Sequence, residues 1–542
     1  MGKDENSVSS VGAPDQLRVT DSVCPHADMV CGQMKRSQLG QPVTQHQVKW
    51  RIAGPVAGKT ALTFGALSVA LFVINALLGP SAAEPVLPGA GPGRNFGASP
   101  SDLTASLLLW GAIAAGGFSL FLGWLALRRG WTISPTRLRA GGFGAAAVMA
   151  AVPPLGSSDL LSYAVYGRMS ALGLNPYTHT VQDLLAQNDP VGQGYTGAWD
   201  QVSSVYGPVG TASQLLASWL SGESIRMFVI WTQLLELGCF IGIALMLDAS
   251  VRSDVVARRR VALLFTCNPL LLYMVVNSGH IDGLAVLFGV AALLVVQRSP
   301  MAAGALVALS VGTKVSFVLY GVALLWGLRH SRRELARFAL AAALTLGVLF
   351  APFLPELLSP LREASQYVAR HSPWHLIVSP ARHVVAEATV HSIVSVLTWV
   401  LIGLVVWRLS RVLPRRIDRA DASTEAVWAA ALLGVAWLLA STYALAWYDV
   451  LALAPLLLLP ASRVDVVLIV RTSVVAFVYV PGLAFSATGG FEFMTTNLSG
   501  TVAPVVGLVL LLVVLFPEKS RLLPRTEPPA SASLRPQQRP SH

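Results

Sequence analysis

The most constraining feature of this sequence is a series of apolar runs, each about 20 residues long. Residues 56–78, 105–127 and 228–247 contain almost no charged side chains. At about 1.5 Å per residue, a helix of that length crosses a hydrocarbon core of about 30 Å. A helix that is apolar on every side needs an apolar environment on every side. These runs therefore predict membrane-spanning helices.

The composition agrees with a membrane protein. Hydrophobic residues make up 54% of the chain and charged residues only 12%, whereas a soluble domain carries about 25% charged residues. The net charge of +11 would suggest nucleic acid in a soluble protein. In a membrane protein, Lys and Arg collect in cytoplasmic loops, so no nucleic-acid partner is expected.

Orientation is predicted from the positions of the basic residues. They gather at 128–139, 252–260, 329–337, 408–419 and 519–525, which predicts that these segments are cytoplasmic. The other long segments between the predicted spans, 80–102, 156–223, 354–390 and 483–500, are then external. Residues 1–50 and 518–542 are polar and aperiodic, and are predicted to be disordered cytoplasmic tails. Residues 51–517 form the predicted transmembrane domain.

The predicted fold is an all-α polytopic bundle with helical external loops. The expected spans are 56–79, 103–127, 139–155, 224–247, 261–277, 283–297, 301–313, 315–328, 336–353, 391–408, 426–446, 448–461, 466–482 and 501–517. The pairs around Lys314 and Tyr448 can also be read as single kinked helices, which leaves about 12 to 14 spans. An even number places both termini in the cytoplasm.

Asp159 is the leading candidate for chemistry. It follows the third predicted span, in the segment SSDLLSYAVYGR, and so lies at the outer membrane surface. Ionisable groups at membrane depth or at its edge are costly and are therefore functional candidates. Alternatively, Ser158 and Asp159 cap a short helix. Tyr163 falls on the same helical face as Asp159, although interfacial aromatics also serve as membrane anchors.

Three further polar clusters interrupt apolar sequence. The turn Asn277–Asp282 contains His280, and Lys314 stands alone among apolar residues, where it can bind an anion or pair with an acid. The 354–390 segment is basic, and a cationic patch there would suit a phosphate. Each cluster also has a purely structural interpretation. The 277–282 segment can be an ordinary polar turn, Lys314 can extend to the membrane surface, and the 354–390 segment can be a solvated loop. The residues singled out in that segment are Arg362, Arg370, His371, Trp374, His375, Arg382 and His383.

The sequence contains no P-loop, dinucleotide fingerprint or zinc-protease motif. An enzyme with this sequence is therefore expected to need neither ATP nor NAD, and no cofactor is expected.

Five ordered motifs carry a family resemblance. They are GSSDLLSYAVYGR (156–168), GLNPY (173–177), SSVYGP (203–208), NPLLLYMVVNSGHIDGL (268–284) and GTKVSF (312–317). Together they resemble the polyprenol-phosphomannose-dependent α-1,6-mannosyltransferases of actinobacteria, which belong to the GT-C glycosyltransferase superfamily. The chain departs from the family pattern at His280-Ile281-Asp282, where His-Asn-Asp is typical.

The resemblance implies an inverting transfer of mannose from polyprenyl-phosphate mannose on the outer face of the membrane, independent of metal. It assigns the catalytic base to Asp159. It also implies substrate contacts from the external loops and turns. The candidate substrate-binding residues are Tyr163, Arg168, Asn175, Tyr177, Tyr206, His280, Asp282, Lys314, His371 and His375. The acceptor is expected to be a mannan, a glycolipid or a secreted natural product, and the bilayer would deliver the donor.

Two other classes of function remain open at this point. A transporter or flippase for a lipid-linked sugar would carry charges near the bilayer midplane and often has repeated halves. No repeat is visible here, and the polar clusters gather on one predicted side. A non-catalytic membrane anchor or assembly protein would tolerate replacement of Asp159, Tyr163 and Asp282.

Overall fold

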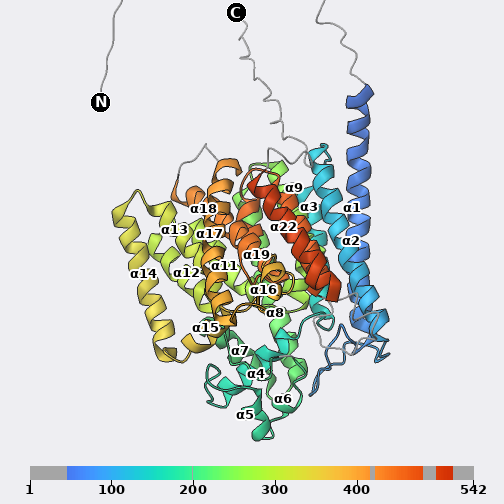
Figure 1. Cartoon of the computed structure of the whole chain (residues 1–542). Helices are drawn as coiled ribbons and strands as arrows, with labels where there is room; N and C mark the ends of the chain where they lie inside the picture. Colours follow the sequence, from blue (N-terminus) through green and yellow to red (C-terminus); the bar gives the residue numbers. More distant parts are fainter. Residues whose placement is uncertain (1–44, 198, 416–420, 480–495, 517–542) are drawn as a thin grey trace, which may run out of the picture. The chain divides into compact units, whose positions relative to one another are not determined.

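The structure is a computed structural model that describes residues 45–197, 199–415, 421–479 and 496–516. The chain divides into two units, Met1–Arg51 and Ile52–His542. All regular structure in the described ranges is helical (Figure 1), which confirms the predicted all-α class.

Eight described helices or helical runs are long and apolar enough to cross a membrane, which agrees with a polytopic protein. Five of them are single helices: α1 (Gln45–Leu78), α2 (Asp102–Arg128), α8 (Ile225–Ser250), α17 (Glu387–Val412) and α18 (Ala422–Ala440). The other three are continuous runs of several elements. The first joins α9 (Val255–Val261), η1 (Ala262–Thr266), α10 (Pro269–Leu271) and η2 (Leu272–Asn277); the second joins α14 (Arg332–Phe350) and η4 (Ala351–Phe353); the third joins η6 (Leu498–Val502) and α22 (Ala503–Leu515).

Shorter helices fill the space between the long ones. They are α3 (Pro135–Ala151), α11 (Asp282–Val295), α12 (Pro300–Thr313), η3 (Val315–Phe317), α13 (Val318–Leu328), η5 (Ala446–Tyr448), α19 (Asp449–Leu457) and α20 (Val464–Tyr479). Lys314 separates α12 from α13, because its backbone is extended (φ −153°, ψ 124°). Likewise, α18 ends at Ala440 and η5 begins at Ala446. Both pairs are therefore separate helices rather than single kinked ones.

The outer helices present apolar side chains to their surroundings. In α14 only 6% of the most apolar stretch of the helix is buried against the rest of the protein. Leu344 and Val348 on this helix are 62% and 78% exposed. Exposing such side chains to water is unfavourable, at about 25 cal/mol per Å². A bilayer removes that cost, so the lateral surface is suited to lipid.

Four helices form a separate layer at one end of the bundle (Figure 1). They are α4 (Asp159–Ala171), α5 (Val181–Ala186), α6 (Pro190–Gln193) and α7 (Pro208–Ser221). This α4–α7 layer has its own apolar core, which includes Leu161, Val165 and Leu184 and also contacts the start of α8 through Phe228. The predicted loop 156–223 is thus a packed helical layer, and it fixes the position of Asp159.

The predicted spans coincide with described helices, and most boundaries differ by only a few residues. The basic 354–390 segment contains two short helices, α15 (Leu358–Ala364) and α16 (His375–Ala381). Helix α1 begins at Gln45, inside the segment predicted as a tail. The rest of the two predicted tails, and residues 483–495 of the fourth predicted external segment, lie outside the described residues.

Candidate active site

The Asn277–Asp282 turn, which follows η2, forms hydrogen bonds to the segment that precedes Asp159. Asn277 Nδ2 donates to the carbonyls of Met149 (3.0 Å) and Pro153 (2.9 Å), and its Oδ1 accepts from Leu155 N–H (3.0 Å). Ser278 Oγ donates to the Leu155 carbonyl (2.8 Å). The Asn277–Asp282 turn therefore does more than reverse the chain, because it holds the 152–158 segment against the bundle.

Gly156 permits the close approach of this segment to η2. Its φ of +79° lies in the region that favours glycine, and a Cβ there would overlap the Tyr273 hydroxyl. Its N–H donates to the Ala83 carbonyl (2.7 Å). The chain then turns into α4, with Asp159 as the first helical residue.

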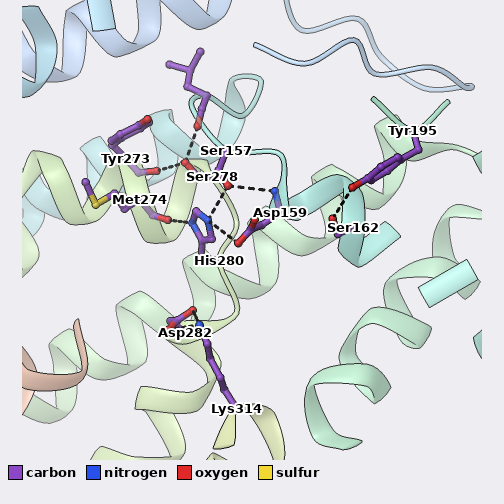
Figure 2. Close-up of polar contacts among 11 residues, drawn as sticks. Ser157, Asp159, Ser162, Tyr195, Tyr273, Met274, Ser278, His280, Asp282 and Lys314 are labelled. Carbon is purple, nitrogen blue, oxygen red and sulfur yellow. Dashed lines mark hydrogen bonds and ion pairs between the residues drawn. The ribbon is translucent and has the colours of Figure 1, made fainter. Parts of the chain in front are cut away.

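Asp159, Ser157 and His280 lie together beneath this turn (Figure 2). The distance between His280 Nε2 and Asp159 Oδ2 is 3.8 Å, and that between His280 Nε2 and Ser157 Oγ is 3.1 Å. Ser157 Oγ also accepts the Asp159 N–H (3.2 Å). Ser158 makes no side-chain cap to α4, so the capping interpretation of the Ser158–Asp159 pair does not describe Ser158. The Asp159 carboxylate instead faces an imidazole.

His280 is held in one tautomer. Its Nδ1 lies within hydrogen-bond distance of the Met274 carbonyl, so Nδ1 carries the proton and Nε2 accepts from the Ser157 hydroxyl. Burial lowers the pKa of His280 to about 3, which keeps the ring neutral near pH 7. Trp447 stacks on the imidazole with ring centroids 3.6 Å apart.

Asp282 and Lys314 form a buried ion pair next to this cluster (Figure 2). Lys314 Nζ lies 3.0 and 2.9 Å from the two carboxylate oxygens, and 3.8 Å from the ring centroid of Tyr448. The pair joins the first residue of α11 to the C-terminal cap of α12. Lys314 is therefore buried and paired with an acid, one of the two roles that the sequence suggested for it.

The surroundings of Asp159 suit a base that acts near neutral pH. Burial raises the pKa of its carboxyl from 3.8 to about 6; the Lys314 charge opposes that rise and the Asp282 charge adds to it. The carboxylate stays ionised at pH 7 while its affinity for a proton is increased. A catalytic pKa close to the working pH favours general base catalysis.

Two predicted tyrosines pack beside Asp159. Tyr163 is fully buried one turn along α4 and makes an edge-to-face contact with Tyr206, with ring centroids 4.9 Å apart. Burial raises the pKa of both phenols well above 10. They remain protonated at pH 7, so they can position a neighbour but cannot act as bases.

Other predicted residues of the α4–α7 layer are engaged in local structure. Arg168 pairs with Asp189 (2.7 Å) and Glu223 (2.9 Å). Asn175 Oδ1 accepts the Tyr177 N–H (3.0 Å), and the Tyr177 hydroxyl lies 2.9 Å from Thr211 Oγ1. These contacts hold the layer together, and a role of Arg168, Asn175 or Tyr177 in substrate binding stays a prediction.

The histidines of the basic segment lie elsewhere. His371 Nε2 donates to the Ala444 carbonyl (3.1 Å), and burial lowers its pKa to about 4. Burial also lowers the pKa of His375, the first residue of α16. His371 is thus neutral near pH 7. The exposed cations of this segment are Arg362, Arg370 and Arg382, and phosphate binding by the segment stays a prediction.

Ser157, Trp447 and Tyr448 belong to the cluster although they were not among the sequence candidates. Ser157 stands in the same motif as Asp159, whereas the two aromatics come from η5, far along the chain. The aromatic pair between apolar runs is the signal that could have singled them out. Within the described part of the chain, no three His, Cys, Asp or Glu side chains are arranged as metal ligands.

Two pockets border this part of the bundle. The first is lined by Ser157, His280 and Trp447 among others. The second has mainly apolar walls from α18, α20 and α22. Val475 of α20 lines the second pocket, and the next residue, Ala476, lines the first. We call them the His280 pocket and the apolar pocket.

One family match covers the core of this cluster. The family description is Alpha-(1->6)-mannopyranosyltransferase, N-terminal domain, and the match runs over residues 58–329, half of the chain. It includes Asp159, His280, Asp282 and Lys314 and ends before Trp447. No curated protein and no solved structure matches the chain.

Proposed function

Because the chain belongs to the alpha-(1->6)-mannopyranosyltransferase family, we propose that it transfers mannose, with inversion, from polyprenyl-phosphate mannose to an acceptor hydroxyl. In this proposal the site faces the outer side of the membrane, both termini are cytoplasmic, and the bundle is of the GT-C type. The observation that carries the proposal is the buried Asp159 carboxylate beside a neutral His280 and the Asp282–Lys314 pair.

Asp159 acts as the general base. Its carboxylate takes the proton of the acceptor hydroxyl while the acceptor oxygen forms a bond to C1 of mannose. The bond between C1 and the phosphate oxygen breaks, and its electron pair leaves with polyprenyl phosphate. Attack from the face opposite the leaving group converts a β-linked donor into an α-mannoside. The Ser157 contacts to Asp159 N–H and His280 keep the base in place.

Lys314 stabilises the leaving phosphate. Its ammonium group has three N–H donors, of which Asp282 accepts two. The third is directed to a phosphate oxygen, where negative charge grows as the C1–O bond breaks. Asp282 holds Lys314 in the position required before the donor arrives, so little reorganisation accompanies the reaction.

The proposal is tested with membranes that contain the protein and a polyprenyl-phosphate mannose labelled in the sugar. The expected result is a labelled α-1,6-mannoside whose formation requires this chain. A purified protein that moves the labelled lipid across vesicles without transferring sugar would instead support a flippase. Retention of biological function after Asp159, Tyr163 and Asp282 are replaced would support a non-catalytic anchor.

The pKa of Asp159 predicts the acid limb of the pH profile. Since this pKa is raised to about 6, the base becomes protonated as the pH falls through 6. We expect kcat/KM to be level above that pH and to fall about tenfold per pH unit below it. The measurement is initial rates from about pH 4.5 to 8 with donor below saturation. A profile that stays level down to about pH 4, the ordinary carboxyl range, would exclude Asp159 as the base in this environment.

The apolar pocket supports a lipid-linked donor. Its walls come mainly from α18, α20 and α22, and α18 and α22 belong to candidate membrane spans, so the pocket offers apolar contacts to a hydrocarbon chain. Gly507 lines this pocket, so replacing it by Leu fills part of it; the added Cβ would lie 3.0 Å from Pro373 Cγ, which must shift slightly. We expect the KM for a long-chain donor to rise about tenfold, since each displaced CH₂ loses about 0.8 kcal/mol.

A donor with a short prenyl chain should be used equally well by Gly507→Leu and the unsubstituted protein. The matched control is Gly403→Leu, in α17, where nothing lies within 4 Å of an added Cβ. It should leave both KM values unchanged. An equal loss with short and long donors would show that the pocket does not hold the chain.

A further inference from the structure

Glu236 is an ionisable residue within the apolar helix α8. The helix runs from Ile225 to Ser250 and qualifies as a membrane span. Glu236 is 0% exposed. A carboxyl group inside a membrane helix carries a large desolvation cost, and such residues persist where they have a functional partner. Neither the proposed transfer step nor the family motifs quoted above use Glu236.

The Glu236 side chain meets the beginning of α11. Among the described residues, neither carboxylate oxygen of Glu236 has a hydrogen-bond partner of ordinary geometry. The backbone N–H groups of Gly283 and Leu284, in the first turn of α11, lie close enough to interact with this carboxylate. Gly283 makes this approach possible, because a Cβ at that position would overlap the Glu236 carboxylate.

The first turn of α11 is where the ion pair begins. Asp282 is the first residue of that helix, and its carboxylate holds Lys314. The first N–H groups of a helix have no partner within it, and an anion at this end is favoured by the helix dipole. Glu236 therefore places a carboxylate from α8 against the turn that carries Asp282.

We infer that Glu236 is a positioning residue, whose carboxylate fixes the first turn of α11 and thereby the Asp282–Lys314 pair that receives the donor phosphate. The role given to that pair rests on the proposed function, while the contact between α8 and α11 does not. Glu236 touches neither sugar nor phosphate. It acts by restricting where Asp282 can hold Lys314.

Three substitutions test whether Glu236 positions the Asp282–Lys314 pair or only fills space between α8 and α11. Glu236→Leu removes the acceptor, and Gly283→Ala keeps Glu236 but displaces its carboxylate. Glu236→Gln retains a carbonyl oxygen in a side chain of similar size, so it should keep the donor KM close to that of the unsubstituted protein. We expect the first two to raise the donor KM about tenfold, because the N–H groups at the start of α11 lose the carboxylate that lies against them, with a smaller change in kcat and none in the acceptor KM. Glu236→Gln should change the donor KM by less than about threefold.

The matched control is Cys239→Ala, a buried position of α8 three residues further along. It perturbs packing on this helix without removing an acceptor, and its donor KM should stay unchanged. If Glu236→Leu does not fold, Gly283→Ala and Glu236→Gln still decide the question, because they differ in whether the oxygen stays in place.

A second readout does not depend on sugar transfer. The protein is treated briefly with an amine-acylating anhydride, and the labelling of Lys314 is compared by mass spectrometry with that of Lys59, which is exposed on α1. In Glu236→Leu and Gly283→Ala, Lys314 should be labelled several times faster relative to Lys59, because its carboxylate partner is no longer held. In Cys239→Ala and Glu236→Gln the ratio should match the unsubstituted protein.

The two readouts distinguish the possible failures. If the labelling ratio and the donor KM are unaffected by Glu236→Leu and Gly283→Ala in a protein that transfers mannose, the positioning role is wrong. If the unsubstituted protein transfers no mannose yet Lys314 labelling still rises in both variants, the contact stands and the proposed function fails.

Discussion

Replacing Asp159 by Asn is expected to reduce mannosyl transfer by about 10²- to 10⁴-fold, the contribution of a general base. Asparagine has nearly the same shape, but its amide cannot accept the acceptor proton. The KM for the lipid donor should change little, because Lys314 rather than Asp159 is assigned to the phosphate. The measurement is the initial rate with labelled polyprenyl-phosphate mannose at saturating donor.

The matched control for this experiment is Asp200→Asn, in the same α4–α7 layer. Within the described part of the chain, the Asp200 carboxylate accepts hydrogen bonds only from the side-chain amides of Gln182 and Gln201, at 3.2 Å each. It should retain full activity. Both variants should be extracted from membranes in the same yield as the unsubstituted protein. Full activity in Asp159→Asn would remove this residue from the mechanism and require another base.

Replacing Lys314 by Met is expected to abolish transfer and also to destabilise the protein by about 3–5 kcal/mol. The reason is that Asp282, only 1% exposed, is left buried without its counter-ion. The double variant Lys314→Met, Asp282→Asn removes both charges and should recover most of the stability. It should remain inactive, because nothing then neutralises the phosphate. Stability is measured as the temperature at which half of the detergent-solubilised protein aggregates.

A partly exposed ion pair provides the comparison. Arg329 and Glu425 lie 3.0 Å apart, with side chains that are 28% and 20% exposed. Arg329→Met should cost no more than about 1 kcal/mol, as is usual for pairs in contact with solvent. If Lys314→Met is no less stable than Arg329→Met, the Asp282–Lys314 pair is not a coupled buried pair. If the double variant transfers mannose, Lys314 does not stabilise the leaving group.

The effect of the two principal variants separates the parts of the site. Asp159→Asn should alter kcat and leave stability unchanged, whereas Lys314→Met should alter both. This difference follows from the structure around each residue. Asp159 loses only its proton affinity when it becomes an amide, while Lys314 neutralises a second buried charge.

The sequence identified the helices because hydrophobicity along the chain is a local property. The apolar runs at 103–127 and 224–247 needed no knowledge of their neighbours, and α2 and α8 are found there. Breaks were harder to predict. The sequence left open whether Lys314 kinks one helix or separates two. The backbone of Lys314 is extended, so it separates two helices, and its ammonium group pairs with Asp282 of α11.

The candidate site was partly visible for the same reason. Asp159, His280, Asp282 and Lys314 are polar residues in apolar surroundings, and each was singled out on that ground. Their mutual arrangement was not visible. The sequence left open whether Ser158 and Asp159 cap a helix, and only the packed structure places the Asp159 carboxylate toward His280.

By itself, then, the sequence determined the all-α membrane class and the small set of polar residues that apolar helices would have to accommodate. The tertiary structure alone decided which of them meet. It brought Trp447 onto His280 and Tyr448 onto Lys314 from a distant part of the chain, and it placed Glu236 against Gly283. The physical reason is that burial can be read from one segment, whereas the partner of a buried charge lies on another helix, and only the packing of the helices fixes which one.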